Sequence, residues 1–229
     1  MVVKDSADEY KAAGGSSIHK EGWLKESMAG ISSVFRLPSF WLITLATFVR
    51  YGTYISIAGL WAGPYLEYTY HIHLVGRGKM LMLFPVGFLL GGPIIGLLSD
   101  RVFRNRKTVA LLAMASYTIF VLPLSGFLPE PSLPLAAGIF FCIGFLNSSS
   151  MVMYAHVKEL LPNSISGTAM SAVNLFTMAG AGFFQHVMGI AIQGFSISQG
   201  QLSPEAFSFA FGLCFVAVAL GALAYFFVK

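Results

Sequence analysis

Six long apolar stretches, separated by short polar breaks, constrain this chain more than any other feature of its sequence. A helix rises about 1.5 Å per residue, so roughly 20 apolar residues cross the hydrocarbon core of a bilayer. Runs this long and continuously apolar lack the alternating pattern of a membrane β-barrel. We therefore predict an all-α membrane protein, a bundle of six transmembrane helices near residues 39–66, 78–100, 107–127, 133–158, 167–193 and 205–228.

The composition agrees with a surface that faces lipid. Charged residues make up only 10% of the chain and hydrophobic residues 56%, and the mean hydropathy is +0.73. A soluble domain carries about 25% charged residues, because it must face water. The net charge of +4 is therefore interpreted as a signal of orientation in the membrane, and we expect the lipid bilayer, not nucleic acid, as the partner of this surface.

The N-terminal residues differ from the rest of the chain. Residues 1–17 are polar and show no periodicity, which predicts a disordered tail or linker. Residues 18–38 place apolar side chains at near-helical spacing between basic ones, a pattern typical of an amphipathic helix on the cytoplasmic surface of the membrane. Residues 39–229 then form the six-helix transmembrane domain, and no apolar core of a signal peptide precedes them.

The distribution of lysine and arginine predicts the orientation. If the N-terminus is cytoplasmic, eleven of the fourteen basic residues lie on that side and only Arg77 and Lys79 lie opposite. Cytoplasmic loops carry such an excess of positive charge. We therefore predict a multi-pass protein of the cell membrane, in a bacterial inner membrane, with both termini in the cytoplasm.

Arg50, the remaining basic residue, lies inside the first predicted span, about 15 Å from the start of the helix. An arginine at that depth costs at least ~2.5 kcal/mol unless a cavity or a partner receives it. No aspartate or glutamate lies in the interior of a predicted span, since Asp100 and Glu205 stand at span ends, so a counter-charge must come from outside these helices. The candidate partners are an anionic substrate, an acid of another domain, tyrosine hydroxyls such as that of Tyr54, and backbone carbonyls at a helix kink.

Two predicted helices carry polar faces. Tyr54 and Trp61 share a face with Arg50 on the first helix, and Asn147, at a similar depth, begins a polar face on the fourth. Such faces line water or bond between helices. The polar residues of the fifth helix, Asn174 among them, are expected at helix interfaces. The candidate substrate-binding residues are Arg50, Tyr54, Trp61, Asn147, Ser150 and Tyr154.

The break between the second and third helices carries the most specific motif, G-L-L-S-D-R-V-F-R-N-R-K over residues 96–107. It resembles the loop signature G-x-L-x-D-R/K-x-G-R-R/K of the major facilitator superfamily, although Phe103 replaces the usual glycine. The resemblance implies a gating motif in which Asp100 pairs with Arg101 or Arg104 and holds one conformation shut. A simple topology signal is the alternative. The candidate gating residues are Gly96, Asp100, Arg101 and Arg104.

The resemblance covers about residues 20–229 and implies the C-terminal six-helix half of a major-facilitator fold. In this family the substrate lies between two halves that move by alternating access, so the resemblance implies a complementary N-terminal half, or a second copy, as partner. The motif S-D-R-V-F-R and the run Arg50–Gly52 resemble organophosphate antiporters, and the run Gly59–Leu66 resembles sugar-phosphate permeases. The resemblance to these phosphate-ester transporters implies a small anionic substrate. The planar guanidinium of arginine can form two parallel hydrogen bonds with a carboxylate or a phosphate.

Small residues mark two helices as packing surfaces. Glycines let helix backbones approach closely. By the resemblance these two helices face the other half, while packing inside the domain is the alternative. The candidate packing residues are Gly87, Gly91 and Gly92 on the second helix and Gly180 and Gly182 on the fifth.

Three classes of function compete for a chain of this kind. A secondary active transporter domain agrees with the resemblance, and a truncated or split facilitator that serves as a structural or interaction module remains the alternative. An intramembrane enzyme is excluded because no nucleophile–base pair, haem ligand pair or metal cluster lies at one depth. We therefore expect no enzyme activity, no cofactor and no metal.

Overall fold

The computed structural model describes residues 32, 34–161, 163–195 and 202–228. The expected tail at residues 1–17 and most of the expected amphipathic helix at residues 18–38 lie outside this part of the chain. Every regular element in the described part is helical, as predicted from the continuous apolar runs. The elements, in chain order, are α3 (Pro38–Ser56), η1 (Ile57–Trp61), α4 (Ala62–Tyr70), α5 (Leu74–Leu81), α6 (Leu83–Leu97), η2 (Leu98–Val102), α7 (Arg106–Val121), η3 (Leu122–Leu124), α8 (Leu133–Asn147), α9 (Ser150–Glu159), α10 (Asn163–Gln193) and α11 (Pro204–Phe226).

Five helical segments are long and apolar enough to cross a membrane, and they match the second to sixth predicted spans. Their bounds are Leu74–Val102, Arg106–Leu124, Leu133–Glu159, Ile165–Gln193 and Pro204–Phe226. The first predicted span forms an equally long segment, α3 to α4, but it falls outside this group. Arg50 and the hydroxyl-bearing residues around it lower the hydropathy of this segment.

Local sequence features explain where several of these helices begin and end. Pro38 occupies the first turn of α3 and Pro204 the first turn of α11, where a missing backbone N–H costs nothing. The Ser203 hydroxyl accepts a hydrogen bond from the Ala206 N–H at 3.3 Å and so forms the N-cap of α11. His71 ends α4 in the left-handed conformation, with φ of 53°.

The fourth predicted span differs from expectation, because it is broken into α8 and α9 at Ser148 and Ser149. The Ser148 hydroxyl donates to the Phe145 carbonyl at 2.7 Å. The backbone there tightens, so that the Leu146 carbonyl receives the Ser149 N–H at 3.1 Å. Serine hydroxyls compete for backbone carbonyls in this way and interrupt helices.

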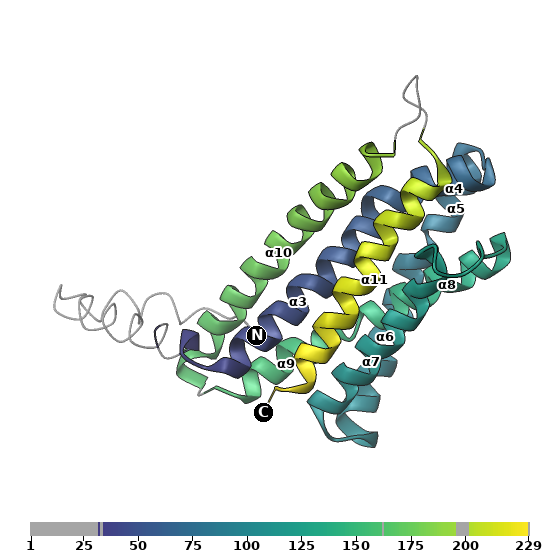
Figure 1. Cartoon of the computed structure of the whole chain (residues 1–229). Helices are drawn as coiled ribbons and strands as arrows, with labels where there is room; N and C mark the ends of the chain where they lie inside the picture. The colour runs from purple at the N-terminus through teal and green to yellow at the C-terminus, as the bar shows by residue number, and fades with distance from the viewer. Residues whose placement is uncertain (1–31, 33, 162, 196–201, 229) are drawn as a thin grey trace, which may run out of the picture.

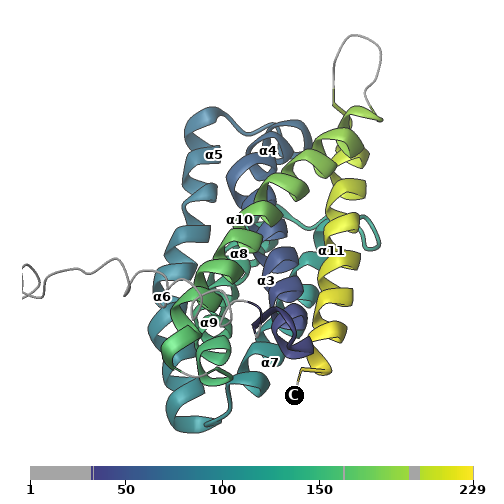
Figure 2. The same cartoon turned by 90° about the vertical axis from the view of Figure 1, so that its left-hand side faces the viewer.

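Helix α3 lies at the centre of the bundle, between α10 and α11 (Figures 1 and 2). Its contact with α10 is close because glycines face each other: a Cβ at Gly180 would collide with the Phe48 carbonyl, and one at Gly52 with the Gly180 carbonyl. Helices α6 and α8 meet in the same manner, since side chains at Gly87 and Gly91 would collide with the backbone of α8.

The five candidate packing glycines therefore divide into two groups. Gly87, Gly91 and Gly180 pack helices together inside the domain, which corrects the expectation that they face another half. A Cβ added at Gly92 or at Gly182 would meet no described atom within 4 Å, so both positions leave open surface on α6 and α10. Helical rotation is the reason: adjacent small residues such as Gly91 and Gly92 lie about 100° apart around the axis and cannot serve one interface.

Candidate functional site

Arg50 lies in the middle of α3 and is 1% exposed. Its Nη2 donates to the Leu146 carbonyl, at the end of α8 where the helix breaks. Its Nη1 lies 3.7 Å from the Met153 sulfur, and its Cζ lies 5.7 Å from the centre of the Tyr117 ring. The Nε atom is buried and has no hydrogen-bond partner among the described residues. The guanidinium thus has one strong acceptor for its five donors.

A cavity of about 210 Å³ opens beside this guanidinium, between α3, α9 and α10. We call it the Arg50 pocket. The Tyr154 hydroxyl lies in it, 3.2 Å from both Asn174 Oδ1 and Thr177 Oγ1, so it bridges α9 and α10. The residues that line the pocket are Thr47, Arg50, Tyr51, Ser150, Met153, Tyr154, Asn174, Thr177 and Met178.

Three of the six candidate substrate-binding residues meet in this pocket, namely Arg50, Ser150 and Tyr154. The other three lie elsewhere. The Tyr54 ring packs edge-on against Phe84, with centroids 6.2 Å apart, and faces the core. Trp61 lies further along, in the π-helical turn η1, with its indole N–H buried.

Asn147 is buried at the last turn of α8, and its Oδ1 has no partner among the described residues. Trp61 leaves the face of Arg50 because a π-helical turn begins at Ile57 and changes the rotation of the helix there. Tyr54 precedes that turn on the regular helix α3, but its ring packs against Phe84 of α6 and does not line the pocket. Asn147 leaves the face of Ser150 because the break at Ser148 lies between them. Neither irregularity is visible in a regular 3.6-residue pattern.

Sequence reasoning missed several contacts of the site. Asn174 and Thr177 were expected at a helix interface; they do bond to a neighbouring helix, and they also line the pocket. Their spacing of three on α10 was the available signal, since it places both on one face. Tyr117, whose ring lies over the Arg50 guanidinium, comes from α7, and no sequence pattern indicated that it would reach the site.

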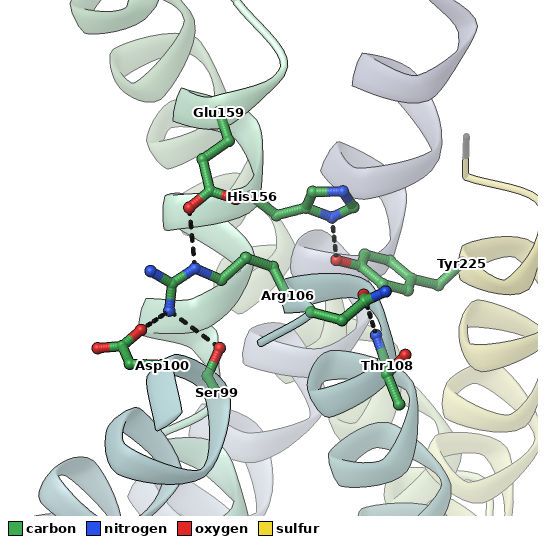
Figure 3. A network of polar contacts seen from close by, with 8 residues as sticks. Ser99, Asp100, Arg106, Thr108, His156, Glu159 and Tyr225 are labelled. Carbon is green, nitrogen blue, oxygen red and sulfur yellow. Dashed lines mark hydrogen bonds and ion pairs between the residues drawn. The ribbon is translucent and has the colours of Figure 1, made fainter. Parts of the chain in front are cut away.

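The gating motif forms an ion-pair network around Arg106, which corrects the expected pairing of Asp100 with Arg101 or Arg104. Arg106 Nη1 donates to the Asp100 carboxylate and, at 2.9 Å, to the Ser99 hydroxyl. Its Nε donates to Glu159 Oε1 at 3.0 Å, so that one side chain joins η2, α7 and α9 (Figure 3). We call these four residues the Arg106 network.

The reason for this pairing is the local geometry of the loop. Asn105 caps α7 by accepting the Thr108 N–H at 3.0 Å, which fixes Arg106 at the first helical position beside η2. The backbone of Arg104 adopts the left-handed conformation, with φ of 48°. Gly96 has open space around it and makes no close helix contact among the described residues. Beside the network, His156 Nδ1 lies 2.8 Å from the Tyr225 hydroxyl and links α9 to α11 (Figure 3).

The fold and these sites define a multi-pass, all-helical membrane protein. The family model described as Major Facilitator Superfamily matches residues 7–185 and 43–229 of this sequence. Since each match covers more than half of the chain, the protein belongs to the major facilitator superfamily.

Similar curated proteins come from yeast and bacteria. "Bypass of stop codon protein 6" of Saccharomyces cerevisiae is 28% identical over 123 residues, which cover 52% of this chain and 24% of that protein. "Membrane sensor protein UhpC" of Escherichia coli is 25% identical over 145 residues, covering 63% of this chain and 33% of the relative. The UhpC of Salmonella typhimurium matches over the same length. The matched segment thus spans a quarter to a third of these relatives.

Solved structures share the fold. The proton:xylose symporter XylE, bound to 6-bromo-6-deoxy-D-glucose, superposes with a TM-score of 0.66 at 17% identity, covering 86% of this chain and 45% of XylE. A partially occluded, inward-open structure of XylE from Escherichia coli gives a TM-score of 0.65 at 18% identity and covers 50% of that chain. The likeness at this identity is one of fold, and it extends over about half of XylE.

Proposed function

We propose that this chain is the C-terminal half of a secondary transporter that moves a small anion by alternating access, and that the Arg50 pocket is its part of the substrate site. The observation that carries the proposal is the pocket itself, where Arg50, Ser150 and Tyr154 from two segments meet Asn174 and Thr177 from a third. Concave sites with a few convergent polar groups are the usual form of small-molecule sites.

The charge of the pocket supports an anion. No acidic residue lines it, and none of the ion pairs formed by the described residues involves Arg50. The Met153 sulfur is a weak acceptor, and Nε has no partner. A carboxylate or phosphate oxygen would form stronger, charge-assisted bonds with these donors.

The competing interpretation is that Arg50 is an anchor for the break between α8 and α9, because its Nη2 already meets the Leu146 carbonyl. The test is binding of inorganic phosphate and small organic phosphates, set against neutral sugars, by the chain assembled with a complementary half. Binding of anions alone supports the proposal. Binding of neutral sugars with no competition by anions contradicts it.

The assembly and orientation belong to the same proposal. A complementary six-helix half, or a second copy, would cover the open surface at Gly92 and Gly182. The excess of basic residues favours cytoplasmic termini, and the UhpC relatives favour a bacterial inner membrane. A cysteine at Asn105 should react only with reagents that enter the cell. Labelling of that cysteine from outside intact cells would refute this orientation.

A second candidate function has one observation in its favour, the name of the relative UhpC, which is a membrane sensor protein. A sensor needs the solute site and the conformational change but not net transport, and it agrees with the alternative of an interaction module. The two functions differ in one measurement: uptake of labelled solute into vesicles that hold the assembled protein. Saturable binding without uptake would favour the sensor.

A further inference from the structure

A second cavity, of about 580 Å³, lies where α7 ends and α11 begins, and it shares no lining residue with the Arg50 pocket. We call it the α11 groove. Its lining on α11 recurs every three to four residues and so forms one helix face about 17 Å long. The groove residues on this face include Glu205, Ser208, Phe209, Gly212, Leu213 and Val216.

Two glycines bring the opposite wall, the loop after α7, close to α11. Gly126 adopts φ of +75°, and a Cβ there would lie 3.0 Å from the Cβ of Ser208. A Cβ at Gly212 would lie 3.1 Å from the Ser125 carbonyl. Side chains at either position would push this loop away from α11, so both glycines keep the groove narrow.

The loop is also fixed at its far end. The Tyr70 hydroxyl donates to the Pro131 carbonyl at 2.5 Å and lies 3.2 Å from the Tyr65 hydroxyl. Tyr65 is itself 1% exposed and packs edge-on against Phe211 of α11, with centroids 5.3 Å apart. The groove is therefore a preformed feature of the bundle.

The two ends of the groove differ in chemistry. At the loop end lie the carboxylates of Glu130 and Glu205, and no described lining residue is cationic. Partial burial, together with the charge of Glu205, raises the pKa of Glu130 above its ordinary value. At the other end Leu213 and Val216 are 38% and 46% exposed. This arrangement complements an amphiphile with a cationic head and an alkyl chain.

We propose that the α11 groove binds one acyl chain of phosphatidylethanolamine, with the primary ammonium group of the lipid between Glu130 and Glu205. The chain spans a bilayer, so lipid is the molecule that surrounds its lateral surface. An ammonium group offers three N–H donors to the two carboxylates. The choline head of phosphatidylcholine offers none, and phosphatidylglycerol carries a net negative charge that the carboxylates would repel.

The test is lipid retention by the purified full chain, measured by native mass spectrometry after exposure to equal amounts of the three lipids. We expect phosphatidylethanolamine to be retained about tenfold over the other two, which corresponds to one charge-assisted hydrogen bond. The double variant Glu130→Gln/Glu205→Gln should lose that preference. The matched control is Glu67→Gln, which removes an acid paired with Arg77 outside the groove, and it should retain the preference.

A second pair of variants tests the apolar end. Leu213→Trp fills the groove and should lower phosphatidylethanolamine retention about tenfold, while Leu220→Trp, an exposed position of the same helix outside the groove, should not. Thermal unfolding checks that all variants fold. Equal retention of the three lipids by the wild-type chain, or an unchanged preference in either groove variant, overturns the proposal. Because the two cavities share no residue, either result leaves the transport proposal untouched.

Discussion

Two arginines organise this molecule in opposite ways. Arg106 has a 26% exposed side chain and uses its donors on two carboxylates and a hydroxyl from neighbouring elements. Arg50 is 1% exposed and meets a backbone carbonyl, a thioether and an aromatic ring. The partly exposed arginine donates three hydrogen bonds to oxygen acceptors, two of them carboxylates, whereas the buried one donates a single hydrogen bond to an oxygen. Arg106 therefore holds helix ends together, and the donors that Arg50 leaves over are the basis of the proposed anion site.

The largest expected effect is at Arg50. Arg50→Gln should weaken anion binding by the assembled transporter about a hundredfold, since it removes a buried, charge-assisted contact. Arg50→Lys should keep the charge but lose the fork, and should bind with intermediate affinity. Isothermal titration with organic phosphate measures both variants.

The control for this comparison is the stability of each variant, followed by thermal unfolding in detergent. If Arg50 only anchors the break between α8 and α9 through Leu146, both variants should lose stability and leave affinity unchanged among the folded molecules. That result would end the distinction drawn between the two arginines.

The next effect is at Arg106. Arg106→Gln breaks the contacts that join Asp100 and Glu159 across three elements, and should lower the free energy of unfolding by about 1–2 kcal/mol, because partly exposed ion pairs contribute up to ~1 kcal/mol each. Chemical denaturation measures this change. Solute affinity should stay within twofold, and a larger loss would show that the network also shapes the site.

A smaller effect is expected at the hydroxyl bridge of the Arg50 pocket. Tyr154→Phe removes the contacts with Asn174 and Thr177 and should cost about 0.6 kcal/mol of stability, the average for hydrogen bonds between membrane helices. Thermal unfolding checks stability, and titration shows whether the hydroxyl also contacts the solute. Met151→Leu, on the exposed side of α9, is the matched control and should change neither.

The smallest effects sharpen the assignment of the gating motif. Arg101→Gln and Arg104→Gln should each change the free energy of unfolding by less than about 0.5 kcal/mol, since both side chains are exposed and form no ion pair among the described residues. A loss as large as that of Arg106→Gln would restore the pairing that the motif alone had suggested.

The sequence predicted the helical fold and the special position of Arg50, but only three of the six candidate substrate-binding residues lie in the pocket, which nine residues line. Hydropathy over some 20 residues depends on composition alone, so the spans could be assigned without any tertiary information. Ser150 and Tyr154 were found because they lie on one regular helix, α9. Trp61 and Asn147 were misplaced because irregular backbone separates them from the faces on which they were counted. Tyr54 was misplaced although the helix is regular there, because its ring packs against Phe84 of α6 and not into the pocket.

The amino-acid sequence by itself determined that this chain spans a membrane as helices and that one arginine must find a partner inside it. Only the tertiary structure decided which partner. Leu146 lies 96 residues from Arg50 in the chain, and Tyr117 reaches the guanidinium from another helix. Such contacts depend on the rotation of each helix about its axis and on close approaches at Gly52 and Gly180. Those rotations are settled when the helices pack, because only then do side chains from distant segments compete for the same space.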